Sequence, residues 1–203
     1  MAINTNKEFN FDGGRVCLDF CNTVDERPGI GRARTIRGEF LESGKDLLEW
    51  SLAAKIISNQ IYRERLDTGV SARNLSAAIS VRELLFRIFS SIVENHEIAD
   101  NSLKELNGHI QNLPPQRIIR TDNGYNLSVG KIDSIEGILE FILRDAIQLI
   151  TSDRLPRLKI CGAEECGWLF LDLSKNGSRR WCDMADCGNR VKARKFYKNS
   201  LKR

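Results

Sequence analysis

Histidine is scarce in this 203-residue sequence, which contains only His96 and His109, both in polar stretches typical of surface helices. Because histidine is a common general base and a frequent ligand of catalytic zinc, its scarcity argues against a zinc hydrolase. No nucleophile stands beside a base in a recognisable pattern. The segment Gly29-Ile30-Gly31 lacks the residues of a phosphate-binding loop or a dinucleotide fingerprint. We therefore expect a protein that is not an enzyme.

Long apolar runs are also missing from the sequence. No stretch reaches the roughly 18 apolar residues that suggest a membrane-spanning helix, and the first fifteen residues lack the apolar region of a secretory signal. We therefore expect a cytoplasmic protein with no membrane partner. In a reducing compartment, its six cysteines are expected to be thiols or metal ligands rather than disulfides.

Charge is unevenly distributed along the chain. Residues 154–203 hold thirteen Lys/Arg against five Asp/Glu, a net charge of +8, whereas the preceding residues carry a net charge of −4. A split of this kind indicates a module that meets a polyanion, joined to one that does not.

Apolar periodicity predicts four helices in the first part of the chain. Apolar side chains recur at helical spacing over residues 46–57, 75–94, 103–113 and 135–150. Ser43 and Asp46 flank the start of the first helix, and Pro114 follows the third. Asp133 and Glu136 resemble a capping box at the start of the fourth.

Other segments of this part predict strands and loops. The turn Asp122-Asn123-Gly124 between two β-prone runs predicts a hairpin. Residues 9–24 fit either a strand or the start of a helix, and residues 26–40, rich in glycine and arginine, predict a basic loop. The chain thus divides into a mostly helical domain, 1–152, and a small unit, 153–203, joined by a short connection over 152–159.

Four cysteines form two matched pairs in the small unit: Cys161, Cys166, Cys182 and Cys187. Two Cys-x4-Cys knuckles separated by fifteen residues suit a tetrahedral zinc ion. The run 168–173 supplies strand residues for a hairpin between the knuckles. Four thiolates leave no open position, so one structural zinc ion per chain is expected, with an iron–sulfur cluster as the second choice.

Metal binding would also stabilise the small unit, because a segment of about 45 residues cannot bury enough apolar surface to fold alone. Zinc contributes about 10–16 kcal/mol in finger peptides, enough to offset much of the ordering entropy. The remaining cysteines, Cys17 and Cys21, have no second pair and are expected to lie in a core.

The chain ends in a basic segment that predicts a helix. Residues 188–203 contain seven Lys/Arg and no acid. We expect its basic face to meet phosphates, and its other face, with Ala193, Phe196 and Tyr197, to pack on the finger. The candidate nucleic-acid contacts are Arg179, Arg180, Trp181, Asn189, Arg190, Lys192, Arg194, Lys195 and Lys198; the arginine and asparagine side chains can also read base edges.

These residues alone leave three interpretations open. The finger can bind duplex DNA, bind RNA with Trp181 or Tyr197 stacked on bases, or serve as a protein-interaction module. Because a lone finger contacts few base pairs, the DNA interpretation favours a homodimer.

The segment CGWLFLDLSKNGSRRWCDMADCGNRVKARKF resembles the CGNR zinc finger, named for the tetrapeptide at 187–190. The preceding part, with Leu18-Asp19-Phe20-Cys21-Asn22-Thr23 as its hallmark, resembles the ABATE domain. The resemblance implies a bacterial, stress-related transcription regulator whose finger binds DNA, with DNA favoured over RNA. It also implies that the four cysteines named above are the zinc ligands.

The expected architecture is therefore α+β and mostly helical. A helical N-terminal domain with one β-hairpin precedes a treble-clef or ribbon-like zinc finger that ends in a basic helix. Asn22, Thr23 and Arg27, with the arginines of the following loop, are candidates for a pocket that binds a small-molecule effector. The alternative is that Asp19, Asn22 and Thr23 tie down the local backbone.

Overall fold

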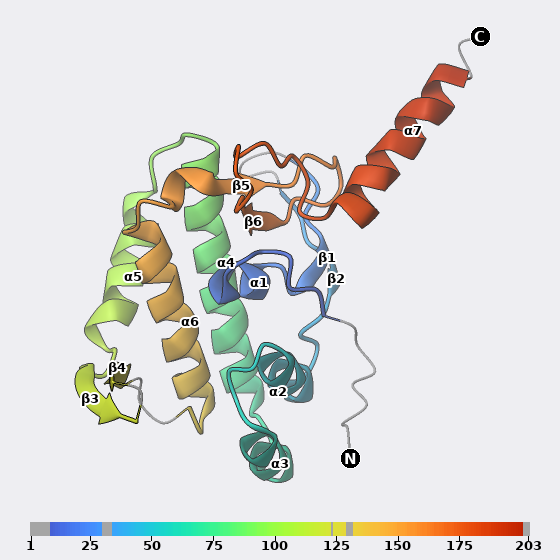
Figure 1. Ribbon diagram of the computed structural model, residues 1–203. Coiled ribbons are helices and arrows are strands. Elements are labelled where there is room, and N and C mark those ends of the chain that lie inside the picture. The colour runs from blue at the N-terminus through green and yellow to red at the C-terminus, as the bar shows by residue number, and fades with distance from the viewer. Residues whose placement is uncertain (1–8, 30–33, 123, 129–131, 201–203) are drawn as a thin grey trace.

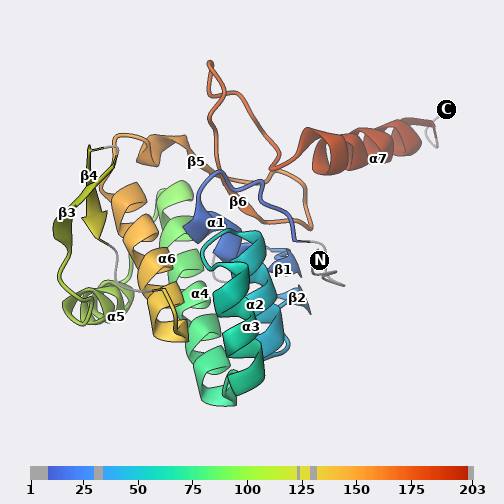
Figure 2. The same ribbon diagram turned by 60° about the horizontal axis from the view of Figure 1, so that its bottom comes forward.

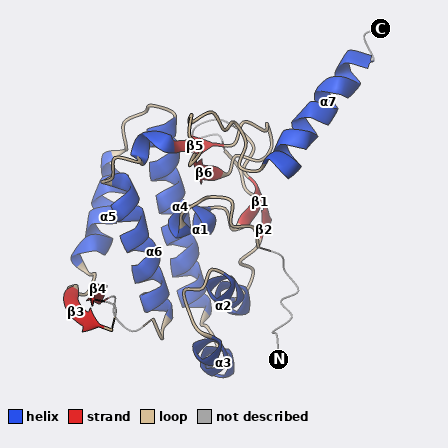
Figure 3. Cartoon of the chain, viewed as in Figure 1, coloured by secondary structure: helices blue, strands red, loops and turns tan. Residues whose placement is uncertain are grey.

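The computed structural model describes residues 9–29, 34–122, 124–128 and 132–200. Its α-helices are α1 (Val16–Cys21), α2 (Gly44–Ala53), α3 (Asn59–Thr68), α4 (Ala72–Val93), α5 (Asp100–Gln111), α6 (Ile135–Ile150) and α7 (Asn189–Ser200), accompanied by the short helical turns η2 (Leu155–Arg157) and η3 (Met184–Gly188). The strands are β1 (Val24–Glu26), β2 (Arg37–Glu39), β3 (Arg117–Thr121), β4 (Gly124–Ser128), β5 (Leu158–Ile160) and β6 (Leu169–Leu171). They pair as three separate antiparallel hairpins, coloured red in Figure 3.

Helix α4 organises the core of the molecule. Its Val81, Leu84, Leu85 and Ile88 are buried on one stripe, which confirms the periodicity seen in the sequence. The helix packs against α1, α2, α5 and α6, and both α4 and α1 also contact β6 (Figures 1 and 2). No helix among the described residues is long and apolar enough to cross a membrane.

Several local predictions are confirmed. Ser43 and Asp46 form a reciprocal capping box at the start of α2, and Thr121 pairs with Gly124 across the predicted β3–β4 turn. The cap of α6 is one residue later than predicted. Ser134, rather than Asp133, adopts the extended N-cap backbone, and its hydroxyl accepts a hydrogen bond from the Gly137 N–H at 3.1 Å.

Residues 9–24, which fitted either a strand or a helix, contain helix α1. The prediction of a loop over 26–40 is partly wrong, because this segment contains strand residues near both of its ends. Glu26 pairs with Arg37 and Val24 with Glu39, so β1 and β2 form a short hairpin. A buried arginine of α4 holds it: Arg82 is fully buried and binds Glu39 with two hydrogen bonds of 2.6 and 2.7 Å. This long-range ion pair has no signature in the local sequence.

The hairpin of the finger also differs from the expectation. β6 pairs with β5, which precedes the first cysteine, so the hairpin encloses the first knuckle instead of linking the two knuckles. Leu169 and Leu171 point into the main core, whereas Phe170 packs in a second cluster around the four cysteines. β6 is thus buried on both faces, which explains its unbroken apolar run.

Residues of the N-terminal segment, among them Asn22 of the hallmark, bind the finger directly. The side chain of Asn22 accepts a hydrogen bond from the Leu169 N–H at 2.9 Å and donates one to the Leu169 carbonyl at 2.8 Å. The Leu171 N–H donates to the Gly13 carbonyl at 2.8 Å. Trp168 donates its indole N–H to the Val24 carbonyl at 2.9 Å. The connection predicted over 152–159 leads into β5, and Leu158 of this strand lies in the main core.

We expect Asn22→Ala to lower the free energy of unfolding by about 2–3 kcal/mol, because it leaves both buried polar groups of Leu169 without a partner. Urea denaturation measures this difference. Asn74→Ala is the matched control, since the Asn74 side chain makes one exposed 3.5 Å contact with Glu136, and we expect a change within about 0.5 kcal/mol. Equal effects of the two substitutions would contradict the role given to Asn22.

Asp19 provides a pH-dependent test of the same region. Burial raises the pKa of Asp19 to about 7, although a hydrogen bond from the Gly13 N–H opposes this shift. A raised folded-state pKa means that stability is lost as the pH rises from about 4 to about 7. We compare the free energy of unfolding of the wild type with that of Asp19→Asn. The wild-type value minus the variant value should fall across this window by up to about 1.4 kcal/mol for each pH unit. Urea titrations at several pH values measure the difference, and a constant difference would contradict the assignment.

Candidate zinc centre and nucleic-acid interface

The four predicted ligands come together in one buried cluster. The sulfur atoms of Cys161, Cys166, Cys182 and Cys187 all lie within 4.8 Å of one another. Two of the Sγ–Sγ distances, Cys166 to Cys182 and Cys182 to Cys187, are both 3.7 Å. Thiolates at about 2.3 Å from a tetrahedral zinc ion lie about 3.8 Å apart. The cluster therefore fits one zinc ion, with a ligand set that leaves no position for a reacting water.

Local hydrogen bonds shape the two knuckles. In the first, the Cys161 N–H donates to the Trp168 carbonyl at 2.7 Å, and the Gly162 N–H donates at 2.8 Å to the carbonyl of Arg180, which precedes the second knuckle. Gly167 has a φ of +65°, and a Cβ there would lie 2.2 Å from the Arg27 carbonyl oxygen. The close approach of the N-terminal domain therefore requires glycine at this position.

The second knuckle leads directly into the basic helix. Asp183 caps η3 by accepting hydrogen bonds from the N–H groups of Ala185 and Asp186. Cys187 lies within η3, and α7 begins at Asn189. A metal bound by Cys187 therefore fixes the direction in which α7 leaves the finger.

Arg190 supports a zinc ligand. Its Nη2 atom donates to the Cys187 sulfur at 3.2 Å, and its Nη1 atom lies 3.8 Å from Glu26 of β1. A cation beside a thiolate stabilises the charged form that binds the metal, and contacts of this kind also orient the ligand. Arg190, a predicted reader of bases, is thus engaged with the finger and with the N-terminal domain.

Three other candidates also make contacts within the finger. Arg179 donates to the Cys182 carbonyl, and its guanidinium lies 4.7 Å from the centre of the Phe170 ring. Asn189 donates to the Ala185 carbonyl at 2.9 Å. Trp181 is half-buried against the cysteine cluster. These residues shape the finger, and their contact with nucleic acid remains a prediction.

The remaining candidates are exposed cations, one just before Cys182 and four on α7: Arg180, Lys192, Arg194, Lys195 and Lys198. Arg194 also forms an ion pair with Glu165 of the first knuckle, at 2.6 Å. We use the name basic surface for these five residues.

Helix α7 projects away from the rest of the molecule (Figures 1 and 2). None of its twelve residues, all of which the structure describes, is buried. Val191 is the one apolar residue of α7 that packs against the cysteine cluster, where it is half-buried next to the contact between Arg190 and Cys187. The prediction that Ala193, Phe196 and Tyr197 pack on the finger is therefore wrong, because all three side chains are exposed.

The three candidate pocket residues have different surroundings. Asn22 is buried and binds Leu169, and Thr23 is buried with its hydroxyl donating to the Phe20 carbonyl at 2.8 Å. These contacts agree with a role in holding the backbone. Arg27 does line a cavity, together with Arg34 of the following loop. Arg32 lies outside the described residues.

An ion pair that the sequence analysis missed holds the segment before the second knuckle. The buried Asp172 accepts a 2.7 Å hydrogen bond from Lys159, which also donates to the carbonyls of Gly177 and Arg179. Burial by itself would raise the pKa of Asp172. Hydrogen bonds from Lys159, Ser174 and the Arg179 backbone outweigh burial and hold this pKa well below its usual value. The only sign of this ion pair in the sequence is an acidic residue within the apolar run 168–173.

Comparison with known families agrees with this geometry. Residues 157–200 match the CGNR zinc finger model. Residues 14–153 match the ABATE model, described as "Putative stress-induced transcription regulator". The chain belongs to the ABATE family. No curated protein matches the chain. The ABATE match includes the hallmark residues that bind β6, and the CGNR match includes all four cysteines.

We expect the purified protein to hold one zinc ion per chain after dialysis, and Cys182→Ser to hold none, because three thiolates and a weak hydroxyl lose most of the binding free energy. Elemental analysis measures the zinc. Cys17→Ala is the control, since Cys17 is a buried cysteine of the main core, and it is expected to keep the ion. A full equivalent of zinc in Cys182→Ser would contradict the proposed ligand set.

Proposed function

We propose that this ABATE protein is a DNA-binding transcription regulator that presents α7 to duplex DNA, with no enzymatic activity of its own. The zinc-binding finger orients the helix, and the basic surface contacts phosphates. The observation that carries the proposal is an exposed helix with five Lys/Arg and no acid, directly attached to a metal ligand.

The dimensions of α7 support this proposal. Its twelve residues extend about 18 Å, and the major groove of DNA, about 12 Å wide, admits a single helix. Phe196 and Tyr197 are 78% and 66% exposed. Large apolar side chains exposed beside cations suit a surface that meets both phosphates and the methyl groups of thymine.

The proposal extends to assembly and location. One finger contacts few base pairs, so we infer a homodimer that places two copies of α7 on neighbouring half-sites. We also place the protein in the cytoplasm, where DNA is accessible in a bacterial cell and where thiols remain reduced for zinc.

We expect the zinc-loaded protein to bind duplex DNA with an affinity that falls steeply with salt. The triple variant Lys192→Gln, Lys195→Gln, Lys198→Gln removes three cations. The slope of log K against log salt concentration should decrease by about 2.7, or roughly 0.9 for each lost phosphate contact. Fluorescence anisotropy with DNA selected from a random pool measures both affinity and slope.

The matched control is Arg63→Gln, Arg73→Gln, Lys104→Gln, which removes three exposed cations from α3, α4 and α5. It changes the net charge equally and should leave the slope within experimental error. Equal slopes for the two triple variants would contradict binding through α7. Preferential binding of single-stranded RNA at matched salt would contradict DNA as the ligand and favour the RNA interpretation.

A further inference from the structure

A cleft of about 620 Å³ lies between α7 and the first zinc knuckle. Its knuckle wall includes Glu164, and its helix wall includes Val191, Arg194, Lys195 and Lys198. These four residues of α7 follow the spacing i, i+3, i+4, i+7, so they share one face of the helix. Three of the four cations that α7 contributes to the basic surface therefore line one cleft.

A carboxylate of the first knuckle holds one of these cations. Glu165 binds the Arg194 guanidinium at 2.6 Å, across 29 positions of the chain. Glu164 adds a second negative charge on the same side of the cleft. A guanidinium group uses the same planar donors for carboxylate and for phosphate oxygens. Glu165 therefore occupies the donors of Arg194 that a phosphate group would use.

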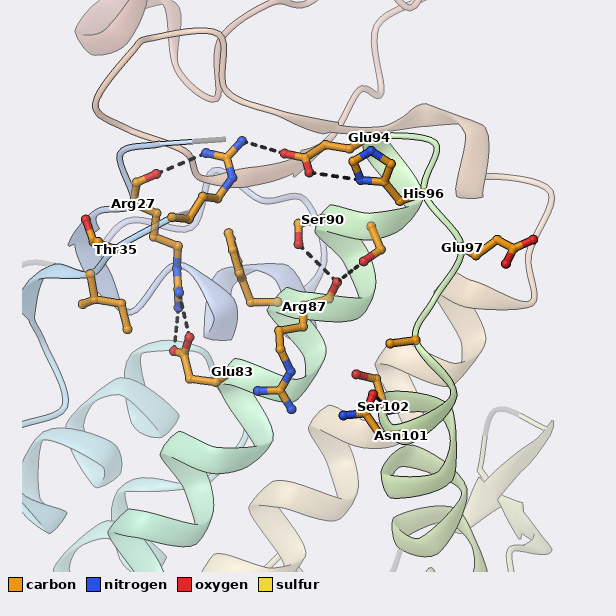
Figure 4. A pocket seen from close by; sticks show the side chains of 15 residues that line it. Arg27, Thr35, Glu83, Arg87, Ser90, Glu94, His96, Glu97, Asn101 and Ser102 are labelled. Carbon is orange, nitrogen blue, oxygen red and sulfur yellow. Dashed lines mark hydrogen bonds and ion pairs between the residues drawn. The ribbon is translucent and has the colours of Figure 1, made fainter. Parts of the chain in front are cut away.

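The exposure of this ion pair allows Arg194 to exchange partners. The side chains of Arg194 and Glu165 are 48% and 37% exposed. By contrast, the ion pair between Arg27 and Glu83, joined by dashed lines in Figure 4, is structural, because the Arg27 side chain is only 3% exposed. An exposed ion pair contributes little to stability, whereas duplex DNA strongly attracts nearby cations. A phosphate group can therefore displace Glu165 and leave the finger folded.

We propose that this cleft receives a phosphodiester group of the DNA backbone, and that Glu165 restrains the free protein by holding Arg194 until the phosphate displaces it. A helix in the major groove has a phosphate backbone along each side, and the cleft provides a place for one of them beside α7. This inference rests on the proposed function and adds to it a phosphate site and the acid that competes for it. Since phosphate contacts carry no sequence information, the competition weakens non-specific binding above all.

The first test measures the DNA affinity of the full zinc-loaded chain by fluorescence anisotropy at several salt concentrations. We expect Glu165→Gln to bind duplex DNA about two- to fivefold more tightly than the wild type, the range set by the strength of one exposed ion pair. The slope of log K against log salt concentration should become steeper by up to about 0.9, the value for one added phosphate contact. Equal affinities of the two proteins would overturn the proposal.

Glu105→Gln is the matched control for the loss of an acid. Arg87, labelled in Figure 4, forms an ion pair with Glu105 at 3.1 Å, and the two side chains are 52% and 45% exposed. The substitution changes the net charge equally and opens a similar ion pair between α4 and α5, far from α7 (Figure 1). It should leave the affinity and the slope unchanged. A gain in affinity equal to that of Glu165→Gln would assign the effect to net charge and overturn the role of Glu165.

A second readout tests the ion pair without measuring affinity. Phenylglyoxal modifies accessible guanidinium groups, and mass spectrometry of peptides measures the rate at each arginine. In protein without DNA, Glu165→Gln should speed the modification of Arg194 at least about twofold and leave Arg87 unchanged, and Glu105→Gln should do the reverse, because each removes one exposed ion pair. An unchanged rate at Arg194 in Glu165→Gln would overturn the restraint.

The same reaction locates the phosphate and separates the two proposals. Bound duplex DNA should protect Arg194 of the wild type from phenylglyoxal, and bound DNA that leaves its rate unchanged would overturn the site. Failure of the wild type and of both variants to bind any DNA would contradict the proposed function itself. DNA binding that is equal in the wild type and Glu165→Gln would leave the proposed function standing and remove only the role of Glu165.

Discussion

The architecture depends on the hydrogen bonds by which the N-terminal segment holds β6. This strand has three residues and buries both faces, Leu169 and Leu171 in the main core and Phe170 beside the cysteines. A two-stranded hairpin is at best marginally stable by itself in water. Asn22 supplies the strand with a donor and an acceptor from one side chain. The two parts of the chain therefore share a strand, and neither completes its core alone.

The zinc centre complements this shared strand. The cluster around the cysteines contains few buried side chains, so metal–sulfur bonds provide much of the stabilisation that a larger apolar core would give. Lys159 and Asp172 hold the intervening loop, and Arg190 joins a cysteine sulfur to β1. The metal, the loop and the N-terminal domain thus together set the direction of α7.

Features encoded locally could be predicted from the sequence, and long-range features could not. The zinc ligands, the helix stripes, the β3–β4 turn and the cap at Ser43 depend on neighbouring residues. The pairing of Asn22 with Leu169 joins residues 147 positions apart, and Arg82 binds Glu39 across 43 positions. The exposure of Phe196 and Tyr197 was missed for a related reason, since helical periodicity defines a face without saying whether another element covers it.

The isolation of α7 has a consequence for how members of such a family diverge. Core residues change slowly because each substitution disturbs close packing, whereas no residue of α7 is buried, within the part of the chain that the structure describes. Substitutions on its surface therefore carry little folding penalty, provided that helix propensity is retained. The same zinc-binding scaffold can therefore present many different helix surfaces with little change in the free energy of unfolding, as long as Arg190 keeps its contact with Cys187.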